Sequence, residues 1–180
     1  TLSTTCTITD LTPGLTYTFS VTATNAAGTS SPSLASSAVS VFDRPSAPQN
    51  VVAAPAPESI GVSFDLPASD GGSAIDDYLA VAFVAATNRF VSRCHPSLAT
   101  RSCTLTGLTT TTTYAIRVFA HNGAGYSVSA SPSSTVTTGY NAPGTPLGVT
   151  ASATSQSITV TWSPPSSDGG GALTGYTVYA

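Results

Sequence analysis

Charged residues are scarce in this chain. Only 7% of its 180 residues are charged, the net charge is −3, and all five basic residues are arginine. Nonspecific nucleic-acid binding requires a basic surface, so this composition argues against it. Hydrophobic residues nevertheless reach 41% and alternate with serine and threonine. This alternation favours β-strands with a core face and a hydroxyl-covered face over a disordered chain.

Long apolar runs and helical periodicity are also missing. No segment approaches the roughly 18 apolar residues of a membrane helix, so we expect no membrane span in these residues. No window of eleven residues has the apolar spacing of an amphipathic helix, which predicts an all-β protein. No signal peptide is visible, and residue 1 is a threonine inside a repeat. We therefore expect the N-terminus of the parent protein to lie elsewhere.

Two different segments of the chain each occur twice. Residues 6–39 return 97 positions later at 103–136, and residues 45–82 return 98 positions later at 143–180. A period near 97 residues has the size of one small β-domain. The repeats therefore predict three units along the chain, of which only the central one is whole.

The complete domain is expected at 44–139, after the C-terminal part of one repeat at 1–43 and before the N-terminal part of a third at 140–180. Within it, short apolar stretches are separated by turn residues, which predicts seven strands in a Greek-key sandwich. The expected strands are Val51–Ala53, Ile60–Phe64, Tyr78–Ala85, Phe90–Cys94, a strand with Cys103 and Leu105, Tyr114–Ala120 and Ser127–Thr137.

Several local motifs point to one family. The sequence Leu11–Tyr17 is typical of a leucine-to-tyrosine corner. The sequence Asn25–Gly28 is typical of a hairpin loop between the last two strands. Trp162 sits in the second strand of the third repeat, where the central repeat has Phe64, and Trp162–Tyr176 is similar to bacterial extracellular versions. On these residues the chain resembles tandem fibronectin type III domains over its whole length. The resemblance implies the seven-stranded Greek-key β-sandwich named above.

The resemblance also implies a function without catalysis. We expect a spacer and adhesion array of a secreted or cell-surface protein, with no cofactor and no catalytic or metal-binding residues. The alternative is a set of accessory modules of an extracellular polysaccharide-active enzyme whose catalytic domain lies outside these residues. The expected partners are neighbouring repeats and a protein or polysaccharide surface ligand. The Arg-Gly-Asp tripeptide that some family members use for adhesion is absent.

Two glycine-rich loops each contain an acidic residue of the kind that binds calcium. Asp70 and Asp168 each begin an Asp-Gly-Gly sequence. Each loop offers a single carboxylate, whereas Ca²⁺ takes about six to eight oxygen ligands. The sequence therefore favours plain turns at both places.

The three cysteines divide into a pair and a single residue. Cys94 and Cys103 are nine positions apart, on consecutive strands of opposite sheets. A disulfide there would close the crossover and add about 2–3 kcal/mol by the loop-entropy relation. The alternative is two buried free thiols. Cys6 is the counterpart of Cys103, and its partner would lie at a position before residue 1, so Cys6 is expected to be free.

One strand of the central repeat, Tyr78–Ala85, is apolar on both faces. Tyr78 and Ala80 point to the core, so the alternate residues Leu79, Val81 and Phe83 face outward. Outward residues of two neighbouring strands lie on the same side. An apolar patch rimmed by three arginines is a candidate interaction surface. Its predicted residues are Leu79, Val81, Phe83, Arg89, Val91, Arg93, Arg117 and Phe119. The alternative is that the arginine stems and the neighbouring strand cover the apolar residues.

Overall fold

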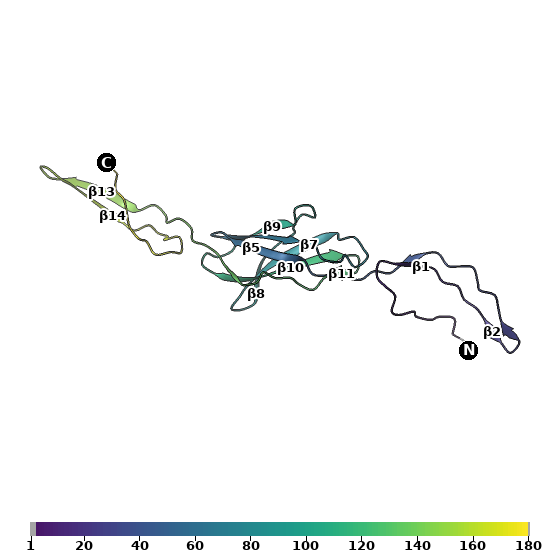
Figure 1. Ribbon diagram of the computed structural model, residues 1–180. Helices are drawn as coiled ribbons and strands as arrows, with labels where there is room; N and C mark the ends of the chain where they lie inside the picture. Colours follow the sequence, from purple (N-terminus) through teal and green to yellow (C-terminus); the bar gives the residue numbers. More distant parts are fainter. Residues whose placement is uncertain (1–2, 180) are drawn as a thin grey trace.

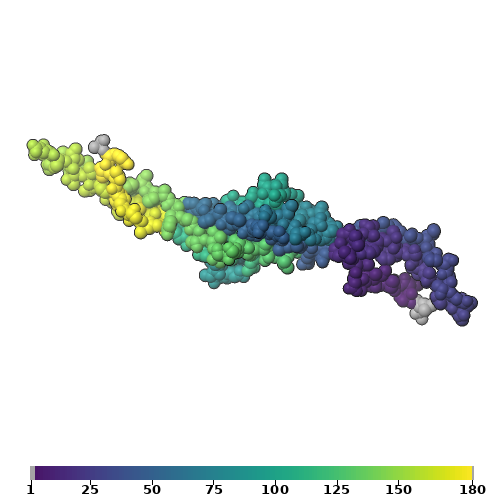
Figure 2. Space-filling model, in the orientation of Figure 1, coloured from purple at the N-terminus to yellow at the C-terminus, as the bar shows by residue number. Residues whose placement is uncertain are grey.

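The computed structural model describes residues 3–179, which form fourteen short β-strands. The strands fall into three groups that follow one another along an elongated molecule (Figures 1 and 2). The first group is β1 (Thr16–Tyr17), β2 (Thr24–Asn25), β3 (Gly28–Thr29) and β4 (Val39–Ser40), and the last is β13 (Leu147–Ala153) and β14 (Ile158–Ser163). Within the described residues no helix could span a membrane. The predicted all-β class is confirmed.

Two antiparallel sheets form the sandwich of the central group (Figure 1). One sheet has the order β5 (Gln49–Pro55), β6 (Ser59–Asp65) and β9 (Ser102–Thr106). The other has the order β11 (Gly125–Tyr126), β10 (Thr113–Asn122), β7 (Asp77–Val84) and β8 (Arg89–Cys94), and β12 (Val136–Thr137) also pairs with β10.

The core between these sheets is built from alternate residues of the strands. In β10 every second side chain from Tyr114 to Asn122 is buried, and the residues between them are half-buried. Phe64, which stands where the third repeat has tryptophan, packs its ring edge-on against Tyr78 with 4.9 Å between ring centroids. Each fully buried apolar side chain of this kind stabilises the fold by roughly 1.5–3 kcal/mol. The predicted alternation is seen in β10, whereas in β7 three successive residues, Ala80, Val81 and Ala82, are buried.

The corner before β10 is held by a tyrosine hydroxyl. The Tyr114 hydroxyl accepts a hydrogen bond from the backbone N–H of Thr109 at 2.9 Å. In the first group, the Tyr17 hydroxyl accepts one from the N–H of Thr12 at 3.0 Å. The same corner is therefore built twice, as the leucine-to-tyrosine motif predicts.

The last predicted strand, Ser127–Thr137, is not continuous, which corrects the prediction. Only Val136 and Thr137 of this range belong to a strand, and a single bridge joins Ala130 to Val118. The Ser127 hydroxyl accepts the N–H of Ala120 at 3.1 Å, a bond that a neighbouring strand would otherwise provide. Side-chain oxygens of serine compete with the regular ladder in this way, and the ladder is interrupted.

The same serine arrangement is repeated three times in the first group. Each serine hydroxyl accepts a hydrogen bond from a backbone N–H of the opposite segment. The serines are spaced three residues apart and the N–H groups two residues apart, so the two segments cannot pair in a regular strand register. The pairs are Ser30 with Ala23, Ser33 with Val21 and Ser36 with Phe19.

Core-type positions of the first and last groups are exposed. Val21 is the counterpart of Val118, yet it is 72% exposed whereas Val118 is 0% exposed. Ile158 and Val178 are likewise more than half exposed. Burial of these residue types in the central group therefore depends on its second sheet.

Candidate interaction surface and inter-repeat junctions

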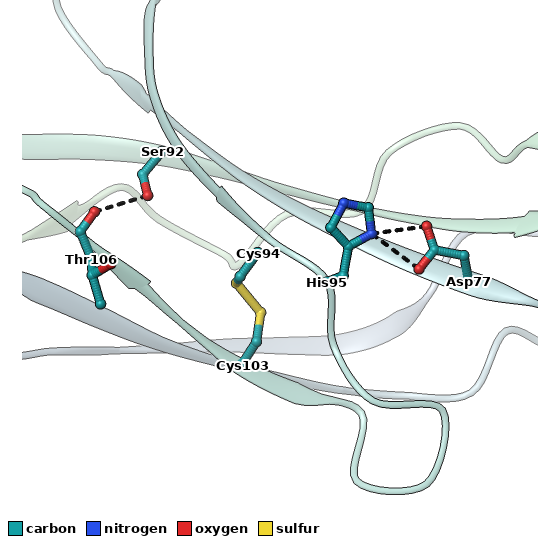
Figure 3. The surroundings of a disulfide bond; sticks show 6 residues. All are labelled: Asp77, Ser92, Cys94, His95, Cys103 and Thr106. Carbon is teal, nitrogen blue, oxygen red and sulfur yellow. Dashed lines mark hydrogen bonds and ion pairs between the residues drawn. A yellow bond between two sulfur atoms is a disulfide. The ribbon is translucent and has the colours of Figure 1, made fainter.

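A disulfide joins the two sheets of the central sandwich at its open side (Figure 3). Cys94 at the end of β8 is bonded to Cys103 in β9, with 6.2 Å between their Cα atoms. Beside it, the Ser92 hydroxyl donates to the carbonyl oxygen of Thr106 at 2.9 Å. The predicted disulfide is confirmed, and Cys6 is free and exposed.

The outward face of β8, β7 and β10 carries side chains in rows that run across the strands. The middle row is Arg93, Val81 and Arg117, since Val81 is paired with both arginines. Val81 is only 7% exposed. The apolar stems of arginines can cover a valine that they flank, and here Arg93 is exposed and Arg117 is half-buried. Val81 and Arg117 thus lie on inner strands of this sheet, whereas Arg93 lies on β8, its edge strand.

A β-bulge in β8 changes which of its side chains face outward. The pairing shifts by one residue, so that Phe90 lies opposite Phe83 and Val91 has no partner in β7. Val91 packs against the core cluster, and Arg89 lies opposite Val84, a residue of the core side. The prediction that Val91 and Arg89 belong to the outward face is therefore wrong. One extra residue reverses the alternation of side chains along a strand.

An aromatic pair lies on one side of the middle row. The Arg117 guanidinium lies 4.8 Å from the ring centroid of Phe83, at cation–π distance. It also donates to the side-chain oxygen of Asn88 at 3.2 Å. The rings of Phe83 and Phe90 meet edge-on, with 6.1 Å between centroids. Phe90 remains 49% exposed.

A second aromatic pair lies on the other side of the middle row. Phe119 is paired with Leu79 across β10 and β7. The ring of Phe119 meets that of Tyr126 edge-on at 6.3 Å. Tyr126 is 38% exposed, and its ring also lies 4.5 Å from that of His121. The outward face therefore has aromatic rings on both sides of two arginines.

Two histidine–aspartate pairs close this end of the face. The Nδ1 atom of His95 lies 3.0 Å from a carboxylate oxygen of Asp77 (Figure 3). The Nδ1 atom of His121 lies 2.6 Å from a carboxylate oxygen of Asp76. The Tyr126 hydroxyl donates to Asp77 at 3.2 Å. Burial, and then this hydrogen bond, raise the pKa of Tyr126 above its ordinary value, so Tyr126 is a neutral donor at neutral pH.

Several residues of this face were not predicted from the sequence. Tyr126 could have been found from the hairpin, because β11 pairs it with His121. Phe90 could not have been found, because its orientation depends on the bulge. Of the predicted set, Leu79, Val81, Phe83, Arg93, Arg117 and Phe119 share the outward side.

The degree of burial on this face sets the cost of mutation. Phe83→Ser is expected to lower the free energy of unfolding by about 1 kcal/mol, because the ring is half-buried and outside the core. Phe64→Ser, the matched core change, is expected to cost about 3–5 kcal/mol. Chemical denaturation followed by circular dichroism measures both. A loss for Phe83→Ser as large as that for Phe64→Ser would contradict the assignment of Phe83 to the outward side.

The junction before the central sandwich is organised by a buried asparagine. The Asn122 side chain is 0% exposed. Its Nδ2 group donates to the carbonyl oxygens of Asp43 and Asp70, both at 2.7 Å. Its Oδ1 atom accepts the N–H of Ala124 at 2.8 Å. One side chain thus joins the linker, the loop between β6 and β7, and the loop between β10 and β11.

Glycines allow the linker to approach that loop. Gly71 has φ +75°, and a Cβ atom on it would lie 2.1 Å from the carbonyl oxygen of Asp43. The N–H of Asp43 donates to the carbonyl oxygen of Gly71 at 2.8 Å. A Cβ atom on Gly72 would lie 2.2 Å from the backbone nitrogen of Gly14. Only glycine fits at these two places, because the conformation and the space both exclude a side chain.

The junction after the central sandwich has the same structure. The N–H of Asn141 donates to the carbonyl oxygen of Gly169 at 2.9 Å. A Cβ atom on Gly169, at φ +74°, would lie 2.1 Å from the carbonyl oxygen of Asn141, and one on Gly170 would lie 2.9 Å from the Thr110 hydroxyl. Both Asp-Gly-Gly sequences therefore serve the contacts between successive groups of strands.

Comparison with known proteins gives a consistent result. The family described as Fibronectin type III domain matches residues 1–39 and 46–137. A stretch of titin domains is 30% identical over 57% of this chain and 35% of that one, with TM-score 0.49. Chicken CNTN1 FN1-FN3 domains are 26% identical over 72% of this chain and 44% of theirs, with TM-score 0.46.

The extracellular region of rat CD45, domains d3-d4, is similar with TM-score 0.53 at 17% identity over 77% of this chain and 73% of that one. At this identity the likeness concerns the fold alone. Domains of the fibronectin type III family are generally non-catalytic modules that mediate interactions. Since the family match covers more than half of its residues, the chain belongs to the fibronectin type III family.

Proposed function

We propose that this chain is a semi-rigid spacer and adhesion array of a secreted or cell-surface protein. The observation that carries the proposal is the pair of junctions built alike around Gly71 and Gly169. Each junction fixes a linker against a loop through backbone hydrogen bonds and close glycine contacts. Such junctions hold successive repeats in line, as in the elongated shape of the molecule (Figure 2).

Two further features support this role. The disulfide between Cys94 and Cys103 fits an oxidising compartment, because cytosolic thiols are kept reduced. In the proposed division, a whole domain at 44–139 lies between two partial repeats. The linker at each of its ends therefore joins two repeats of the same array. The proposed array keeps successive repeats at a fixed distance from one another and exposes their sheet faces to partners.

The junction can be tested by measuring the distance between repeats. Spin labels on Cys6 and on Ser131→Cys, both exposed positions, report on the first junction by double electron–electron resonance. We expect one narrow distance distribution for this pair. Adding Gly72→Ala is expected to broaden or shift it, because the new Cβ atom would collide with the backbone of Gly14.

The matched control is Gly61→Ala. This glycine lies in β6, and its nearest neighbour to an added Cβ atom is at 3.8 Å, so the substitution should leave the distribution unchanged. A broad distribution in the parent pair would refute a semi-rigid spacer. An identical narrow distribution with Gly72→Ala would refute the role assigned to the glycine contact.

A further inference from the structure

We propose that Asn122 and Gly123 form a site of spontaneous covalent modification, at which loss of the asparagine amide releases the junction before the central sandwich. Asn122 ends β10, and Gly123 begins the loop that leads to β11. An asparagine followed by glycine occurs only here in the 180 residues. The inference rests on the proposed spacer role, because it concerns the junction that keeps the first repeat in line.

The reaction needs only groups of the chain and water. The backbone nitrogen of Gly123 forms a bond to Cγ of Asn122, the bond from Cγ to Nδ2 breaks, and Nδ2 leaves as ammonia with the proton of the attacking nitrogen. Water then opens the five-membered imide: its oxygen bonds to one of the two ring carbonyl carbons, and the ring nitrogen takes a proton. The product is aspartate or isoaspartate, depending on which bond opens. Glycine favours ring closure because no side chain hinders the attacking nitrogen.

The closed junction holds the amide in an unreactive state. Its Nδ2 group donates to the carbonyl oxygens of Asp43 and Asp70, both at 2.7 Å. Its Oδ1 atom accepts the N–H of Ala124 at 2.8 Å, and the Asn122 side chain is 0% exposed. The leaving nitrogen needs a proton, whereas carbonyl oxygens can only accept one in a hydrogen bond. These three bonds also resist the turn that brings Cγ toward the Gly123 nitrogen. The reaction therefore requires the linker to move away.

The product does not close the junction again. Either product carries a carboxylate and no amide group, so it cannot donate to the carbonyl oxygens of Asp43 and Asp70. A buried charge without a partner is strongly unfavourable. Isoaspartate also lengthens the main chain beside the pairing of Asn122 with Gly125. The modification is thus a one-way change from a fixed junction to a loose one.

The first repeat contains a matched loop without this protection. Asn25 is the counterpart of Asn122, and both side chains accept the N–H of the residue two positions later. Asn25 is exposed, however. Ala26→Gly gives its loop the same four residues as Asn122–Gly125. One chain then carries the same short sequence in an exposed loop and in a buried one.

The test incubates the full 180-residue Ala26→Gly chain at mildly alkaline pH and follows both asparagines by mass spectrometry of their peptides. The rate at a protected site follows the fraction of molecules in which that site is open. We therefore expect Asn25 to convert at least about tenfold faster than Asn122 in the folded chain. In denaturant, where no junction exists, the two rates should agree within about threefold.

Gly71→Ala tests control by the linker. The added Cβ atom would lie 2.1 Å from the carbonyl oxygen of Asp43, at a φ of +75°. Because both effects destabilise the closed junction, conversion of Asn122 in the folded chain should be about tenfold faster, and conversion of Asn25 unchanged. Thermal melting establishes that this variant is folded. The comparison of Asn25 with Asn122 in Ala26→Gly needs no change in the central sandwich.

Gly123→Ala tests the chemistry itself. An added Cβ atom would have its nearest neighbours, the side chains of Phe42 and Ser73, at 3.6 Å, so the junction should stay intact. In denaturant this variant should convert Asn122 as slowly as the wild-type chain converts Asn25, which is followed by alanine.

Three rate measurements can overturn the inference. They are equal rates at both asparagines of the folded Ala26→Gly chain, no acceleration by folded Gly71→Ala, and no slowing by Gly123→Ala in denaturant. The distance between spin labels on Cys6 and Ser131→Cys provides a further check. Molecules converted at Asn122, separated by their added negative charge, should lose the narrow distribution, and its retention would also overturn the inference. A broad distribution before conversion would refute the spacer role instead, while the rates would still decide the modification site.

Discussion

Asn122→Asp is expected to lower the free energy of unfolding of the central sandwich by about 3–5 kcal/mol at neutral pH, the cost of a buried charge without a partner. The wild-type amide donates to the carbonyl oxygens of Asp43 and Asp70. A carboxylate in its place would face these oxygens with no hydrogen to donate. Denaturant unfolding followed by circular dichroism measures the loss.

The chain provides a matched control for this change. Asn25 is the counterpart of Asn122 and accepts the N–H of Ala27 at 2.9 Å, as Asn122 does with Ala124. Asn25 is exposed, so Asn25→Asp is expected to change stability by less than about 0.5 kcal/mol. Equal effects of the two substitutions would show that burial of the Asn122 amide does not stabilise the junction. The Cys6 to Ser131→Cys distance should also broaden with Asn122→Asp alone.

Removing the disulfide is expected to cost about 2–3 kcal/mol of unfolding free energy, by the loop-entropy relation for a separation of nine residues. The bond between Cys94 and Cys103 ties β8 to β9 across the open side of the sandwich. Without it the unfolded chain gains freedom and the two edge strands lose their covalent link. Thermal unfolding of Cys94→Ser with Cys103→Ser, compared with the parent chain, measures the effect.

Cys6→Ser is the control, because Cys6 is free and exposed. It should leave the thermal midpoint unchanged. Labelling of the oxidised, denatured parent chain should find one reactive thiol, and after reduction it should find three. Three reactive thiols before reduction, or a stability unaffected by the double substitution, would contradict the assigned bridge.

Much of the central sandwich follows from sequence pattern alone. The alternation in Tyr114–Ala120 predicts which residues are buried, because successive side chains of a strand point to opposite sides. The spacing of Cys94 and Cys103 places them on consecutive strands, and the structure joins them. The tyrosine corner, which occurs twice in the structure, is likewise visible as a repeated sequence motif.

The outward face was predicted less well. Its arginines and aromatic residues could be assigned to strands. Because of the bulge in β8, however, Phe90 faces outward and Val91 packs against the core. A bulge inserts one residue through a local change in backbone conformation, and no residue type in β8 requires it. The interrupted last strand has a similar cause, since Ser127 satisfies a backbone N–H that a ladder would otherwise use.

The sequence by itself determined the repeat, the all-β class and the parity of the long strands, and it indicated which two cysteines could pair. These depend on local periodicity and on copies of the same pattern, which can be read along the chain. Only the tertiary structure decided that Asn122 joins three segments and that the Asp-Gly-Gly sequences receive the linkers. It also decided that Arg93 and Arg117 lie on either side of Val81. Those features depend on contacts between residues distant in sequence, whose register is set by the packing of two sheets and not by any single strand.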